Sequence, residues 1–536
     1  MYRALTACLI LLLAACSSDE SAPPSNDAAD EALQVADAAG DEALRVADAA
    51  DDEALRINAG ADPTAFRTYD AETFFMTTSY SATSSAGRAF SPDGSRVLVS
   101  SDETGVFNLR AFDVETGEST ALTESTTNAI FSLGYFPADE RVLYTFDEGG
   151  NELNHVYVRE VDGETRDLTP GENIKAGFWG WLGDGSGFWI GSTERDGRNF
   201  DLYRYATDGY DRELVFQNDD GFQLSAVSPD GRWLALDKPR TSADSDIYLK
   251  DLTSDEAPQL ITAHDGNVSH GVLTFTPDSA ALYYVTNEHG EFAQAWSHDI
   301  ESGDKQPVIE ADWDVQFVGF SSTGRYRVSG INADAVTELT VLDTTNGEPV
   351  ALPELPAGNV ANVRFSADDT AMAFFLNGDT QPSDLYVVGL EDASARRYTQ
   401  ALNPEIDATH LVEATIVRYP SFDGLEIPSV LYRPKQATAE TPAPALVLVH
   451  GGPGGQTRKG YRAFVQHLVN HGYAVLGANN RGSSGYGKTF FHMDDRRHGE
   501  EDLKDIVWGR TYLETLDWVD GERIGVIGGS YGGYMT

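Results

Sequence analysis

The chain has 536 residues, too many for one ordinary domain and enough for about two to four. Hydrophobic residues make up 41% of it and aromatic residues 10%, which excludes a chain that is disordered throughout. Its 85 acidic residues outnumber 38 Lys and Arg residues and give a formal charge of −47. This charge argues against binding of nucleic acid, and against binding of anionic lipid through charge.

Residues 1–16 have the features of an export signal. Arg3 precedes a largely apolar run over residues 4–15, which is too short for a helix to span a membrane. Residues 13–16, Leu-Ala-Ala-Cys, resemble the lipobox of bacterial lipoproteins. The resemblance implies cleavage before Cys16 and attachment to a membrane through lipid on Cys16. Ser17 at the next position implies the outer membrane, facing the periplasm. The alternative is an ordinary cleaved signal with an incidental cysteine.

Residues 17–65 are rich in Ala, Asp, Ser and Pro and contain an acidic repeat of eleven residues. Leu33, Leu44 and Leu55 recur at this period, which fits one face of a helix with about 3.67 residues per turn. We expect a solvated tether that is partly helical. A coiled segment that binds a partner is the alternative. The only other cysteine, Cys8, lies in the signal, so the exported chain would have no intrachain disulfide.

Residues 70–410 repeat a turn followed by a strand-like run, as in Ser91-Pro92-Asp93-Gly94 before residues 96–100. Proline and Asp-Gly pairs favour tight turns between paired strands. A period of 45 to 48 residues with several short strands indicates a blade of a β-propeller, and seven copies predict seven blades. A row of separate β-sandwiches is the alternative. The aligned turn positions are 93, 139, 184, 230, 278, 323 and 368.

From residue 412 strands alternate with helices, which predicts a parallel α/β sheet with the start of an α/β-hydrolase domain over 412–536. The predicted strands are 414–419, its return 427–432, the apolar run 445–449, 473–476 and 523–528. The predicted helices are 461–471, with Phe464 and Leu468 at helical spacing, and 501–516.

Gly528-Gly529-Ser530-Tyr531-Gly532 matches the G-x-S-x-G nucleophile elbow, in which a serine lies on a sharp turn from strand to helix. Gly528 and Gly532 are expected where side chains would collide, and Ser530 is expected to be the exposed nucleophile. The pattern alone is weak, and a structural turn is the alternative. Here it follows a buried strand and an HGG loop about 80 residues upstream, which strengthens it.

His450-Gly451-Gly452-Pro453-Gly454-Gly455 follows the apolar strand directly. We assign the N–H of Gly452, together with that of Tyr531, to an oxyanion hole, because backbone donors reach an oxyanion only where no side chain intervenes. His450 and Gly451 are interpreted as loop support rather than as catalytic groups.

A seven-bladed propeller, HGGPGG, Asn480-Arg481-Gly482-Ser483 and GGSYGGYMT together resemble the prolyl oligopeptidase family of serine peptidases, over roughly residues 70–536. The elbow is most similar to the acylaminoacyl-peptidase and dipeptidyl-peptidase branch. The resemblance implies a propeller that admits only short peptides and an acyl-enzyme on Ser530. No cofactor and no metal are expected. The sequence leaves open whether Arg481 supports the substrate or the structure, and it leaves open the oligomeric state.

In this fold the catalytic residues follow the order Ser, Asp, His along the chain. No Asp or His follows Ser530. We therefore expect an incomplete hydrolase domain, truncated after the elbow, that is inactive alone. An esterase on the same fold and a non-catalytic propeller scaffold are the alternatives. Substrate specificity stays open, because nothing in the sequence selects an amine-binding carboxylate among acids such as Glu288, Glu291 and Glu301.

Overall fold

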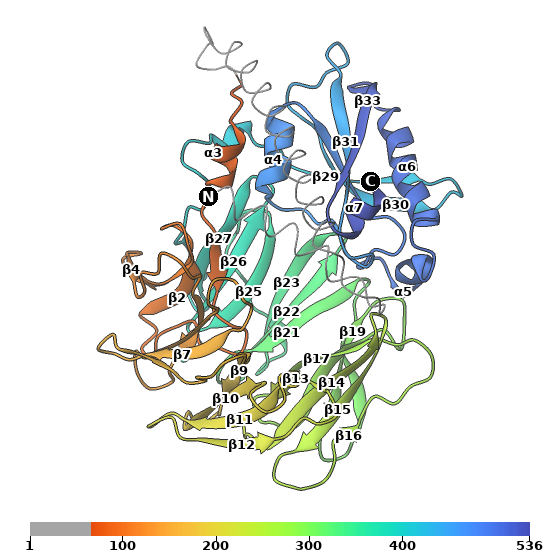
Figure 1. Cartoon of the computed structure of the whole chain (residues 1–536). Helices are drawn as coiled ribbons and strands as arrows, with labels where there is room; N and C mark the ends of the chain where they lie inside the picture. The colour runs from red at the N-terminus through yellow and green to blue at the C-terminus, as the bar shows by residue number, and fades with distance from the viewer. Residues whose placement is uncertain (1–65) are drawn as a thin grey trace, which may run out of the picture.

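The computed structural model describes residues 66–536, so the expected signal, Cys16 and the acidic repeat lie outside the described residues. Seven antiparallel sheets of four strands each follow one another between residues 80 and 397. They form a seven-bladed propeller, as the sequence predicts, and the hydrolase domain lies against one of its faces (Figure 1). The blades comprise, in order, β1 (Tyr80–Ala82), β2 (Arg96–Ser101), β3 (Asn108–Asp113), β4 (Ser119–Ala121); β5 (Phe131–Tyr135), β6 (Val142–Phe146), β7 (His155–Arg159), β8 (Thr165–Asp167); β9 (Ala176–Trp181), β10 (Gly187–Ser192), β11 (Asp201–Ala206), β12 (Arg212–Phe216); β13 (Gln223–Val227), β14 (Trp233–Thr241), β15 (Asp244–Asp251), β16 (Gln259–Leu260); β17 (His270–Phe275), β18 (Ala281–Thr286), β19 (Gln294–Asp299), β20 (Lys305–Ile309); β21 (Asp314–Phe320), β22 (Tyr326–Ala333), β23 (Val336–Asp343), β24 (Glu348–Pro349); and β25 (Asn359–Phe365), β26 (Ala371–Gly378), β27 (Gln381–Gly389), β28 (Ala395–Arg397).

The repeated turn joins the first and second strands of a blade and is held by its own side chains. In the first blade Asp93 Oδ1 accepts hydrogen bonds from Ser91 Oγ at 2.7 Å and from the N–H of Ser95 at 3.0 Å. These bonds lower the pKa of Asp93 to about 2. Ser366 and Asp368 repeat the hydroxyl–carboxylate bond at 2.7 Å in the seventh blade. The repeated sequence therefore produces the same local hydrogen bond in each of these turns.

The ring closes without an exchanged strand, because every blade consists of four consecutive strands. Arg364 of the seventh blade donates to the carbonyl oxygens of Thr83 and Ser84 in the first blade, at 2.9 and 3.2 Å. Burial lowers the pKa of Arg364 to about 10. The Tyr398 hydroxyl donates to the carbonyl of Val114 at 2.6 Å. Side-chain contacts thus hold the first and last blades together.

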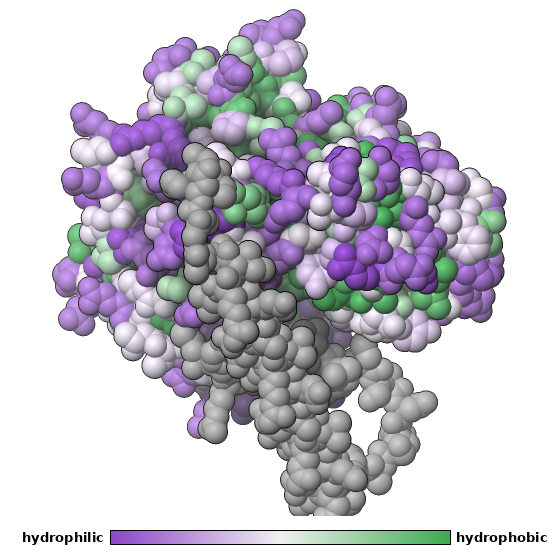
Figure 2. Space-filling model, turned by 90° about the horizontal axis from the view of Figure 1, so that it is seen from above, coloured by the Kyte–Doolittle hydropathy of each residue, from purple (hydrophilic) through white to green (hydrophobic). Residues whose placement is uncertain are grey.

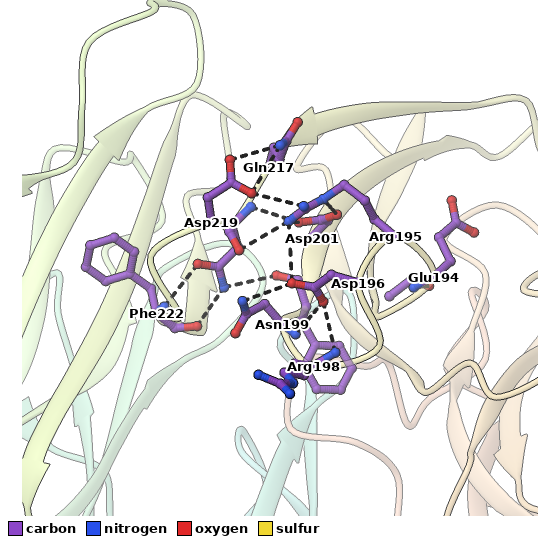
Figure 3. Close-up of polar contacts among 12 residues, drawn as sticks. Glu194, Arg195, Asp196, Arg198, Asn199, Asp201, Gln217, Asp219 and Phe222 are labelled. Carbon is purple, nitrogen blue, oxygen red and sulfur yellow. Dashed lines mark hydrogen bonds and ion pairs between the residues drawn. The ribbon is translucent and has the colours of Figure 1, made fainter.

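Some acidic side chains of the propeller are neutralised by arginines in clusters of ion pairs. One such cluster lies where the third and fourth blades meet (Figure 3). Arg195 bonds the fully buried Asp201 through two nitrogens, at 2.7 and 3.0 Å, and lies 2.9 Å from Asp219. Asp201 also accepts the N–H of Asn218 at 2.8 Å. These contacts order two neighbouring loops, so part of the negative charge has a structural use.

The hydrolase domain contains a five-stranded sheet in the order β29-β30-β32-β31-β33. Its strands β31, β32 and β33 are parallel, but β30 pairs antiparallel with β29 and β32, so the sheet is mixed rather than wholly parallel. The reason is the tight turn after β29, which returns the chain at once and leaves no crossover helix. The elements are η1 (Ala408–His410), β29 (Thr415–Pro420), β30 (Glu426–Tyr432), β31 (Ala443–Val449), α4 (Ala463–Asn470), β32 (Ala474–Ala478), α5 (Lys488–Phe491), η2 (His492–Asp494), α6 (Glu501–Leu513), β33 (Val519–Gly528) and α7 (Tyr531–Met535).

Helix α4 forms where predicted but buries a different face. Val465 and Val469 are buried, whereas Phe464 is 38% exposed. A short helix that the sequence analysis did not predict, α3 (Ala71–Phe75), packs beside α4 (Figure 1). The buried Phe74 of α3 belongs to a core cluster with Tyr461 of the hydrolase domain. The chain therefore contacts the hydrolase domain before it enters the propeller.

Seen from the hydrolase end, the surface is largely hydrophilic, with hydrophobic side chains scattered between (Figure 2). Within residues 66–536, no helix combines the length and the apolar character needed to cross a membrane.

Candidate active site

Ser530 lies between β33 and α7 in a backbone conformation that non-glycine residues rarely adopt, with φ 55° and ψ −124°. The flanking glycines are needed for space. A Cβ on Gly528 would lie 2.5 Å from the carbonyl of Gly532, and one on Gly532 would lie 2.2 Å from the carbonyl oxygen of Val449. The strand, the turn and the helix are thus packed too closely for side chains, which is the geometry of a nucleophile elbow.

The loop over residues 450–461, here called the glycine loop, passes directly beside Ser530. A Cβ on Gly451 would lie 3.2 Å from Ser530 Cβ and 3.7 Å from its Oγ. Gly452 has a φ of +52° and open space where a side chain would stand. Tyr531 is the first residue of α7, so its N–H has no partner within the helix. The structure therefore brings Gly451, Gly452 and Tyr531 to the same end of the sheet as Ser530.

None of the hydrogen bonds that His450 forms with described residues involves the Ser530 hydroxyl. Its Nε2 lies 2.8 Å from Ser483 Oγ, and its Nδ1 lies 3.2 Å from the carbonyl oxygen of Gly451. Ser483 Oγ donates to the carbonyl of Asn480 at 2.6 Å. Burial lowers the pKa of His450, which favours the neutral imidazole. His450 thereby joins the glycine loop to the loop after β32.

Arg481 is buried between two acidic side chains. It is 4% exposed, and its Nε and one terminal nitrogen donate to the two oxygens of the fully buried Asp505, at 2.9 and 2.8 Å. The guanidinium also bonds Asp423 at 3.0 and 3.1 Å and lies over the Phe422 ring. Burial opposes the charge, but the two carboxylates raise the pKa of Arg481. These contacts join the loop after β32 to α6 and to the turn between β29 and β30.

Two buried acids on α6 were not among the residues predicted from the sequence. Asp505 binds Arg481, and Asp502, which is 1% exposed, accepts a hydrogen bond from the Tyr531 hydroxyl. Burial and the Asp502 carboxylate raise the pKa of Tyr531 strongly. Their spacing of three residues places both acids on one face of a helix. Two acids on one face of a helix could have been noticed in the sequence, because charged residues usually lie on the face of a helix that is turned to solvent.

Among the hydrogen bonds of residues 66–536, none joins a histidine to the Ser530 hydroxyl. His498, the histidine closest to the elbow in sequence, packs its ring against Tyr531 at 5.3 Å and lies 3.5 Å from Asp494. Glu291, one of the acids considered for amine binding, instead accepts the N–H and hydroxyl of Thr489, both at 2.9 Å. In the described part of the chain, no group of three or more His, Cys, Asp or Glu is arranged to hold a metal ion.

Two family models match the chain. The N-terminal β-propeller domain of prolyl oligopeptidase matches residues 123–401, and the prolyl oligopeptidase family model matches residues 460–536. The chain belongs to the prolyl oligopeptidase family. The second match includes the elbow and most of the hydrolase elements described above.

Relatives differ in how much of their length this chain spans. It is 26% identical to dipeptidyl aminopeptidase BIII of Pseudoxanthomonas mexicana over 468 residues, which cover 83% of this chain and 66% of that protein. It is 30% identical to the acylamino-acid-releasing enzyme of Sus scrofa over 115 residues, which cover 22% of this chain and 16% of that enzyme. A crystal structure of puromycin hydrolase has the same fold, with a TM-score of 0.72 at 18% identity, covering 88% of this chain and 77% of that one.

Proposed function

We propose that this protein is a serine peptidase that hydrolyses short peptides through an acyl-enzyme on Ser530. The observation that carries the proposal is the strained Ser530 beside Gly451 and Gly452, two residues without side chains. Ser530 Oγ would attack the scissile carbonyl carbon, the peptide amine would leave, and water would release the acyl group. The N–H groups of Gly452 and Tyr531 would hold the oxyanion in both steps. The propeller would restrict access to peptides that can pass it.

We propose further that these 536 residues alone do not hydrolyse peptides. The hydrogen bonds of the described residues 66–536 support this, because none of them joins a histidine to the Ser530 hydroxyl. A serine without a base is a poor nucleophile. The 536-residue chain alone should therefore show no measurable peptide hydrolysis.

The test uses the product of the complete reading frame. A serine-directed fluorophosphonate should label it, and Ser530→Ala should abolish both labelling and cleavage of peptide nitroanilides. Faster cleavage of p-nitrophenyl esters than of acyl-peptides and dipeptides would favour an esterase. A protein that is not labelled would favour a scaffold. Full activity of the 536-residue chain would refute its proposed inactivity.

We also propose export and attachment to the outer membrane through lipid on Cys16. The apolar run over residues 4–15 and the lipobox-like residues 13–16 support this proposal. Cys16→Ala should move the protein from the detergent phase to the aqueous phase in a phase-partition assay. An unchanged partition would refute the anchor.

A further inference from the structure

The second half of the glycine loop is bound to the propeller rather than to the hydrolase domain alone. Its residues Gln456, Arg458, Lys459, Gly460 and Tyr461 each bond a residue of the sixth or seventh blade. The pairs are Gln456 with Asn332 at 2.8 Å, Arg458 with Thr337 at 2.8 Å, Lys459 with Ala335 at 3.2 Å and with Asn359 at 2.7 Å, Gly460 with Asp379 at 2.9 Å, and Tyr461 with Asn377 at 2.7 Å.

The hairpin between β22 and β23, residues 332–337, is built into the hydrolase domain. Its tip residues Asp334 and Ala335 have φ values of 50° and 69°, a conformation usually left to Asn-Gly. Ala335 is fully buried in a core cluster with Val430 and Val465 of the hydrolase domain. Such backbone strain persists only where surrounding contacts hold it. Docking against the hydrolase domain supplies those contacts.

Asp379, between β26 and β27, receives three donors on its two carboxylate oxygens. Oδ1 accepts the N–H of Gly460 at 2.9 Å, and Oδ2 accepts the N–H of Ala414 at 3.0 Å and lies 3.1 Å from Lys459 Nζ. The side chain of Asp379 is 6% exposed. One carboxylate of the seventh blade therefore fixes both the end of the glycine loop and the segment that enters β29.

The two halves of the glycine loop are in direct contact. The N–H of Gly455 donates to the carbonyl of Gly452 at 2.7 Å, and a Cβ on Gly455 would lie 2.3 Å from the carbonyl oxygen of Gly451. Gln456 follows Gly455 immediately. These contacts give a path by which a shift of residues 456–460 would reach Gly452 and Gly451, of which Gly451 lies beside Ser530.

We propose that Asp379 and Asn332 of the propeller are positioning residues that hold the glycine loop, and with it the N–H of Gly452, in place beside Ser530. The inference rests on the proposed function, since it assigns the Gly452 N–H to the oxyanion hole. The propeller then has a role beyond restricting access, because it completes the geometry of the site.

The experiment compares Asn332→Ala and Asp379→Asn with Thr489→Ala in the product of the complete reading frame. Thr489 is a matched control, because its side chain bonds Glu291 of the fifth blade across the same pair of domains and makes no hydrogen bond with the glycine loop. We expect kcat for a peptide nitroanilide to fall about tenfold in the first two variants, with KM within about twofold. This is less than the loss of a whole oxyanion donor. Thr489→Ala should keep kcat within about twofold.

Hydrogen exchange gives a second readout that does not need activity. In the 536-residue chain, amides over residues 451–460 should exchange at least about tenfold faster in Asn332→Ala, while the blades keep their protection. Asn332→Ala loses one side-chain bond, so it remains informative where Asp379→Asn does not fold. Unchanged exchange, or an equal fall of kcat in all three variants, would overturn the inference. An inactive wild type would refute the proposed function, and exchange would still decide whether the propeller holds the loop.

Discussion

Gly94 in the propeller and Gly532 in the hydrolase domain are both fixed by geometry, but for different reasons. Gly94 has a φ of +72° and open space where a Cβ would stand, so only its backbone conformation demands glycine. Gly532 needs no left-handed conformation, but a Cβ would meet the Val449 carbonyl at 2.2 Å. The propeller repeats a local turn, whereas the elbow depends on close contact between segments distant in sequence. Substitutions should therefore cost more in the hydrolase domain.

Gly532→Ala should have the largest effect. Its Cβ would force α7 away from β31, and we expect a loss of more than about 3 kcal/mol in the free energy of unfolding of the hydrolase domain. Urea denaturation followed by tryptophan fluorescence, to which Trp518 in the core of this domain contributes, would measure it.

Gly529→Ala is the matched control, because a Cβ on Gly529 meets no atom within 4 Å. It should leave the urea midpoint nearly unchanged. Equal losses in both variants would contradict the explanation by lack of space.

Arg481→Ala should cost about 3 kcal/mol, because it leaves the fully buried Asp505 carboxylate without its cation. Arg195→Ala in the propeller removes a similar two-nitrogen contact to the fully buried Asp201. The Arg195 side chain is 30% exposed, so water can replace part of its role, and the loss should be smaller. Thermal midpoints of the two variants give the order, and a larger loss for Arg195→Ala would contradict it.

The same contrast explains what the sequence could predict. The seven blades were predictable, because the repeated turn, as in Ser91-Pro92-Asp93-Gly94, is held by its own side chains. The elbow was predictable from the short pattern GGSYGG, but its packing against Val449 was not. Helix α3, the strained tip at Asp334 and Ala335, and the contacts of Asp379 were not predictable, because each depends on a partner far away in sequence. The contacts of Arg481 with Asp505 and Asp423 were not predictable for the same reason.

His270 of the fifth blade is a buried titratable group, and its pKa makes the stability of the propeller depend on pH. It is 3% exposed, and burial, with smaller contributions from His264 and Lys305, lowers its pKa to about 4. Between the usual value of 6.5 and about 4, the unfolded chain binds a proton that the folded chain does not, so stability falls as the pH falls through this window.

His270→Phe should remove this dependence. After allowance for solvent screening, we expect the wild type to lose on the order of 2 kcal/mol more than the variant between pH 6.5 and pH 4. Urea midpoints at a series of pH values measure the difference. Parallel curves for the two proteins would mean that His270 takes up its proton normally in the folded state.

Gly94→Ala should have the smallest effect, about 1 kcal/mol, which is the cost of placing alanine in a left-handed conformation. Gly290→Ala is its control, because Gly290 has equally open space but no positive φ, and it should be neutral or slightly stabilising. The thermal midpoint of the propeller would report both variants. A loss at Gly94 as large as that at Gly532 would end the distinction between the two regions, because it would mean that a blade depends on each turn as closely as the elbow depends on its packing.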